Sequence, residues 1–163
     1  MTEENGRRLL TVLHAAERTG PPLLALRFLR WLRQERPDWH LDTLFLDGGG
    51  ELTTAFEELG TVVVADPVRR TSSSWKPVHA ANRALSRQLA GLGTIDLAHV
   101  HCAGSMRVVP TLPPAPILCH VHELSVGLDF HLDRGARRHL TDAARYIAVS
   151  DAVRNELVGR FEI

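Results

Sequence analysis

The chain has 163 residues, enough for one domain that buries roughly two-thirds of the surface exposed by its unfolded form. Its 19 Lys and Arg residues balance 19 Asp and Glu residues, so its overall charge does not favour binding to nucleic acid. The two cysteines lack the spacing of a disulfide scaffold or a zinc ribbon, and the first apolar run is too short for a signal peptide or membrane span. We therefore expect a soluble, cytoplasmic protein with a single domain over residues 1–163.

Strand-like and helix-like patterns alternate along the first half of the chain. Residues 9–14 form a β-prone run, and an amphipathic helix is predicted from the two prolines at 21 and 22 to about Glu35. A strand over 41–47, a helix after the glycines at 48–50 and a strand over 61–65 follow. Gly60 is expected to adopt the left-handed conformation that commonly ends a helix.

Residues 66–77 contain Arg69, Arg70 and Lys76 without hydrophobic periodicity, and a surface loop is predicted there. These basic residues leave open a contact with an anionic acceptor or a peripheral contact with a membrane. A solvated charge cluster is the preferred interpretation.

The second half continues the alternation, with a helix over 78–89 and a strand over 95–102. A short helix then ends at Pro110, and a buried strand begins at Pro116. Residues 129–144 are predicted as a loop and helix, residues 145–149 as a strand, and Ser150 as the start of a last helix. The pattern predicts an α/β fold with a doubly wound, mainly parallel sheet of about six strands.

Two of the predicted strands carry histidines at alternate positions, which places each pair on one side of its strand: His99 with His101, and His120 with His122. If these strands are neighbours, the four imidazoles approach one another near Cys102 and Glu123, and such ligands suit zinc. However, helices are expected to cover a parallel sheet tightly, and no His-x-x-x-His or Cys-x-x-Cys spacing is present. We therefore predict no metal site.

The four histidines divide by their position along the strands. For His99 and His120, the preferred interpretation is structural, with the ring hydrogen-bonded to backbone. His101 and His122 end their strands, where an imidazole can orient a substrate hydroxyl or a leaving phosphate. Glu123 is a candidate base or sugar-hydroxyl acceptor, and a carboxylate favoured at a helix start is an equal alternative.

Other candidate residues lie at predicted helix starts. Thr19 and Gly20 form a strand-to-helix turn whose backbone N–H groups can face an anion, although the turn is neither a Gly-x-Gly-x-x-Gly nor a Walker loop. Ser105 and Ser150 are expected to cap helices. Neither serine lies in a Gly-x-Ser-x-Gly motif, which argues against a hydrolase nucleophile.

Four segments together resemble, in order and spacing, the N-terminal domain of GT-B glycosyltransferases of family 4: residues 12–23, 95–101, 120–124 and 146–154. The most specific are His-Val-His-Glu-Leu at 120–124 and Ala-Val-Ser-Asp-Ala-Val-Arg at 148–154. The resemblance implies a Rossmann-like half that binds the acceptor and helps to hold the donor sugar. A C-terminal half of the same protein would bind the nucleotide.

The resemblance also implies retaining, metal-independent transfer from a nucleotide sugar, with no cofactor. It places Gly20 near the donor phosphates and His122 near the reacting sugar, where His122 stabilises charge as the catalytic residue. The remaining candidates, all for substrate binding, are Thr19, His101, Ser105, Glu123 and Ser150.

This sequence departs from the family pattern at two places. Two prolines follow the single glycine of the first turn, and the C-terminal half with its Glu-x7-Glu motif is absent. We therefore expect residues 1–163 to fold but not to transfer sugar alone. Two alternatives stay open: a stand-alone, non-catalytic Rossmann-like binding module, and a His/Cys metalloenzyme.

Overall fold

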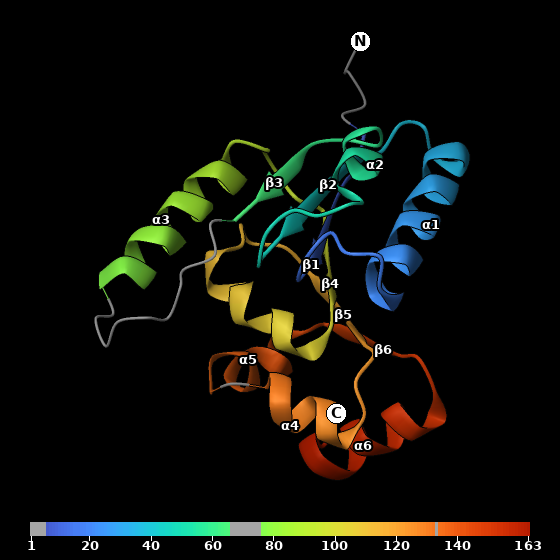
Figure 1. Cartoon of the computed structure of the whole chain (residues 1–163), viewed down its shortest axis with the longest axis vertical. Coiled ribbons are helices and arrows are strands. Elements are labelled where there is room, and N and C mark those ends of the chain that lie inside the picture. The colour runs from blue at the N-terminus through green and yellow to red at the C-terminus, as the bar shows by residue number, and fades with distance from the viewer. Residues whose placement is uncertain (1–5, 66–75, 133) are drawn as a thin grey trace.

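The structure is a computed structural model that describes residues 6–65, 76–132 and 134–163. Six parallel strands form one sheet in the order β3-β2-β1-β4-β5-β6, as Figure 1 shows. The strands are β1 (Arg8–Leu13), β2 (His40–Phe45), β3 (Val62–Val64), β4 (Leu97–His101), β5 (Ile117–Val121) and β6 (Arg145–Ala148). The predicted α/β, doubly wound architecture is confirmed, and the order is that of a Rossmann-like sheet.

Helices connect every pair of consecutive strands. The α-helices are α1 (Gly20–Glu35), α2 (Thr53–Glu57), α3 (Lys76–Ala90), α4 (Ser125–His131), α5 (Arg134–His139) and α6 (Asp151–Phe161). Two 3-10 helices, η1 (Ala103–Thr111) and η2 (Leu140–Asp142), complete the connections. Within the described ranges, no helix has the length and apolar character needed to cross a membrane.

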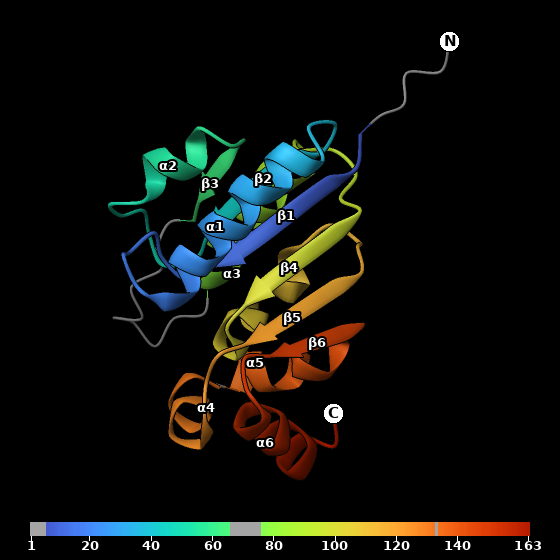
Figure 2. The ribbon, with the colours of Figure 1, turned by 90° about the vertical axis from the view of Figure 1, so that its right-hand side faces the viewer.

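The order of the strands places the helices on different faces of the sheet. From β1 the chain winds outward to β2 and β3, and later winds in the opposite direction through β4, β5 and β6. Because parallel crossovers are right-handed, the two directions put their helices on opposite faces. Figure 2 shows α1 in front of β1, whereas none of the described helices lies in front of β4, β5 or β6.

Two hydrophobic clusters correspond to the two faces. The larger cluster joins alternate residues of the central strands, such as Val100 and Val121, to side chains from α3, η1, α4 and α6. The smaller cluster packs Leu9, Leu13 and Phe45 against α1 and α2. Apolar packing of α1 therefore ends near β4, and the histidines begin there.

Four local predictions were wrong. Gly60 does not have a positive φ; a Cβ there would lie 1.8 Å from the Leu41 carbonyl oxygen, so close backbone approach explains the glycine. Pro110 lies inside η1 rather than ending it. An earlier helix, α4, already begins at Ser125, and α3 takes in Lys76 from the predicted loop. Arg69 and Arg70 lie outside the described residues.

Candidate functional site

Polar side chains gather where neighbouring strands end. All six strands are parallel, so their carboxyl ends lie along one edge of the sheet. The winding direction reverses between β1 and β4, and ligands of doubly wound sheets bind in the crevice outside such a point. His14 follows β1, His101 ends β4 and His122 follows β5, which puts three imidazoles at this point.

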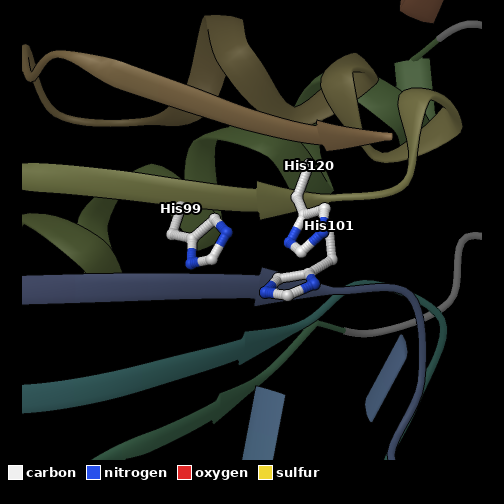
Figure 3. Close-up of side chains that lie close together, drawn as sticks. All are labelled: His99, His101 and His120. Atoms are coloured by element: carbon white, nitrogen blue, oxygen red, sulfur yellow. The ribbon is translucent and has the colours of Figure 1, made fainter. Parts of the chain in front are cut away.

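The four histidines of β4 and β5 form one cluster. His101 pairs with His120 in the β4–β5 register, and their ring centroids are 5.0 Å apart. The His99 ring is stacked parallel to that of His120 at 5.5 Å, and His101 lies 4.2 Å from His99. His122 stacks on His120 at 4.3 Å. Figure 3 shows His99, His101 and His120 directed toward one another, as the alternation in the sequence predicted.

Hydrogen bonding within the cluster is incomplete. His101 Nδ1 and His122 Nε2 are 3.3 Å apart and share one hydrogen bond. The other ring nitrogen of His101, Nε2, is buried without a partner among the described residues, as are His99 Nε2 and His120 Nδ1. The predicted backbone hydrogen bonds of His99 and His120 therefore do not reach these nitrogens.

Burial keeps these imidazoles neutral. Desolvation, helped by the neighbouring imidazoles, lowers the pKa of His99 to about 4 and that of His101 to about 2. The pKa of His120 falls to about 4 for the same reasons, and burial and then His14 lower the pKa of His122. At neutral pH, His122 therefore acts as a neutral hydrogen-bonding group.

Glu123 and Cys102 lie beside the cluster. The Glu123 carboxylate accepts the backbone N–H of His122 at 3.0 Å. It is not a helix-start residue, because α4 begins at Ser125 with Leu124 as its N-cap. Cys102 has a positive φ of 70°, a conformation uncommon outside glycine, and its N–H donates to the His120 carbonyl. Burial and then Glu123 raise the pKa of the Cys102 thiol well above its ordinary range.

The turn before α1 is open to solvent. Thr19 is the N-cap residue of α1, and its side chain makes no capping hydrogen bond. Gly20 is exposed, and a Cβ added there would meet nothing within 4 Å. Packing within the described chain therefore does not require a glycine at this position.

The two serines differ from each other. Ser105 is the third residue of η1, with Cys102 as the N-cap, so the capping prediction was wrong; its hydroxyl is buried without a partner among the described residues. Ser150 is the N-cap of α6, as predicted, and its hydroxyl accepts the N–H of Val153. Ser150 lines a pocket of about 950 Å³ between β6 and α6, whose lining includes none of the clustered histidines.

The structure thus brings together His101, His122 and Glu123 at the carboxyl edge. Ser150 follows the end of β6 at the same edge, one strand beyond β5. His101 is only 1% exposed, so any influence on a ligand passes through His122. Sequence reasoning missed His14, because a single polar residue after an apolar run has no periodic signal. Thr11, the register partner of His99, was also missed, because a single threonine inside an apolar strand is an ordinary residue there, although its hydroxyl is buried without a partner among the described residues.

No protein-family model matches the sequence. The curated proteins likewise contain no match.

Proposed function

We propose that the chain is the N-terminal, acceptor-side domain of a retaining, metal-independent GT-B glycosyltransferase that transfers a sugar from a nucleotide sugar. One observation carries the proposal. Three segments lie at the carboxyl ends of the adjacent parallel strands β1, β4 and β5: the turn at Thr19 and Gly20 after β1, the end of β4, and the His122-Glu123 segment after β5. Three of the segments that resemble family 4 therefore meet where a Rossmann-like sheet binds its ligand.

In this proposal the residues at the edge have separate tasks. The open turn at Gly20 lies beside the donor phosphates, and its backbone N–H groups face the anion. His122 contacts the reacting sugar as a neutral imidazole and stabilises charge that develops during transfer. The bond from the sugar to the phosphate breaks, a bond to the acceptor oxygen forms, and the acceptor proton passes to the departing phosphate. A C-terminal domain of the same protein, in the cytoplasm, holds the nucleotide.

The test measures sugar transfer by the complete gene product across a panel of nucleotide sugars. His122→Ala should lower kcat by about 100-fold or more, the usual cost of losing one preorganised charge-stabilising group. His40→Ala is the matched control, because His40 is exposed and begins β2 at the opposite edge. Residues 1–163 alone should be inactive. Unchanged transfer by His122→Ala would overturn the assignment.

A non-catalytic binding module is the second candidate. One observation supports it: among the described residues, the His122 ring forms a hydrogen bond with His101 and none with a carboxylate, so His122 is not part of an acid–base pair. The same panel separates the two functions. A binding module would bind a nucleotide sugar without transferring the sugar, and His122→Ala would weaken that binding.

A further inference from the structure

Three imidazoles converge below the carboxyl edge in a way that the proposed function does not use. His99, His101 and His120 each offer a ring nitrogen, and these three nitrogens lie within 4.8 Å of one another. Figure 3 shows the three rings close together on one side of the sheet, over β4 and toward β1. The side chains come from adjacent strands of a rigid sheet, which suits a preorganised ligand set.

A second observation points to a ligand. Each of the same three residues has a buried ring nitrogen without a hydrogen-bond partner among the described residues. Buried polar atoms in folded proteins are nearly always satisfied, and a group of exceptions calls for a bound water or ion. A single cation would satisfy one nitrogen from each ring at once.

We propose that His99, His101 and His120 bind one divalent transition-metal ion, with Zn²⁺ as the ion that the ligands fit best. Imidazole suits zinc, copper and nickel, whereas calcium and magnesium require oxygen ligands. Three histidines with a fourth position left to water form a known type of tetrahedral zinc site. The described cluster includes neither Cys102 nor Glu123, so the site is built of imidazole alone.

The geometry needs an adjustment of the rings. Nitrogens bound to one tetrahedral ion at about 2.0–2.1 Å lie about 3.3–3.4 Å apart. The widest present separation, up to 4.8 Å, therefore has to shrink by up to about 1.4 Å, so binding of the ion has to rotate the imidazole rings toward one another.

The ion would also define the tautomer of His101. With the metal on Nε2, the Nδ1 atom of His101 carries the proton and donates it to His122 Nε2, 3.3 Å away. His122 then orients a metal ligand, as hydrogen-bonded partners of metal-bound histidines commonly do. The ion lies beneath the edge and takes no part in the proposed sugar transfer.

The experiment titrates metal-free, tag-free protein with Zn²⁺ by calorimetry and with Co²⁺ by visible absorption. Wild-type protein should bind one ion and give the intense Co²⁺ bands of a four-coordinate site. His99→Leu and His120→Leu should each weaken binding strongly, because each removes a metal ligand. The loss should exceed the about 10- to 100-fold that follows from removing a residue that only hydrogen-bonds to a ligand. His40→Leu, at the exposed start of β2, should leave binding unchanged.

Absence of Zn²⁺ binding to the wild-type protein, or an affinity for Zn²⁺ in both leucine variants equal to that of wild type, would overturn the proposal. If a leucine variant does not fold, NMR of the wild-type Co²⁺ protein decides: imidazole protons of His99, His101 and His120 should show large paramagnetic shifts, and shifts confined to other residues would refute the site. The titration uses no sugar, so its outcome is independent of the transfer assay.

Discussion

The two faces of β4 and β5 show how differently one pair of strands can be used. Toward α3, η1, α4 and α6, the strands present Val100, Cys119 and Val121, each fully buried among apolar side chains. Toward the other face, the alternate positions carry His99, His101 and His120, which are nearly as well buried. Burial alone therefore does not decide the residue type. The residue type depends instead on which helices cover each face.

The difference follows from the reach of α1. Its Phe28 ring contacts His99 edge-on at 5.9 Å, and beyond β4 the histidines cover one another. Farther along the same face, Ile147 of β6 is 39% exposed. The helix-covered face provides apolar stability, whereas the histidine face gives up some of that stability for groups able to bind a ligand.

The largest expected effect comes from placing a charge on each face in turn. Val121→Asp buries a carboxylate in the larger cluster and should cost about 4 kcal/mol or more, enough to unfold a marginally stable domain. Ile147→Asp, on the neighbouring strand and the open face, should cost about 1 kcal/mol. Urea unfolding followed by circular dichroism measures both. Equal losses would show that the faces do not differ.

Acid should weaken the histidine face next. The pKa of His99 in the folded protein is about 4, below its ordinary 6.5, so the unfolded chain binds more protons between these values. The free energy of unfolding of metal-free protein should therefore fall as pH drops from 6.5 to 4, by up to about 3 kcal/mol for His99. Urea midpoints in chelator at several pH values measure the change.

His99→Leu supplies the control for this pH dependence. The substitution removes the titrating ring and its unpartnered nitrogen, so the metal-free variant should match or exceed wild-type stability at pH 7. Its midpoint should fall less steeply between pH 6.5 and 5. Parallel curves for the two proteins would mean that His99 does not contribute to the acid sensitivity.

A smaller effect should follow from loss of the His101–His122 hydrogen bond. His122→Ala leaves the three proposed ligands in place but frees Nδ1 of His101, which should weaken Zn²⁺ binding by about 10- to 100-fold. His139→Ala, in α5 and bonded to Asp142, should leave the affinity unchanged. If Zn²⁺ binds His122→Ala as tightly as wild type, His122 does not orient the ligand.

Much of this comparison could be predicted from the sequence. Histidines two residues apart, at 99 and 101 and again at 120 and 122, share one side of each strand, and apolar residues alternate with them. The doubly wound class followed from the alternation of strands and helices. These features are local and periodic, so each depends on the chain's own pattern rather than on its neighbours.

The remaining features depend on contacts between distant segments. The expectation that helices cover the histidines was only partly right: Phe28 of α1 contacts His99, but no described helix lies in front of β5. The side on which each helix lies depends on the winding direction, which the pattern does not specify. The glycine at position 60 is explained by a carbonyl nineteen residues earlier in the chain, at Leu41. Whether His14 and Thr11 lie near the cluster depended on which strands became neighbours, and only the strand order decides that.

The smallest expected effect compares the helix starts on the two faces. Ser150 caps α6 on the apolar face, so Ser150→Ala should cost about 1 kcal/mol, because the N–H of Val153 loses its acceptor. Thr19 is the N-cap of α1 on the histidine face and makes no side-chain cap, so Thr19→Ala should change stability by less than about 0.5 kcal/mol. Thermal unfolding of both variants measures the difference. A cost at Thr19 equal to that at Ser150 would mean that the Thr19 hydroxyl already stabilises the helix. No cost would mean that it does not, so that in the wild-type protein this hydroxyl is free for a ligand at the open turn.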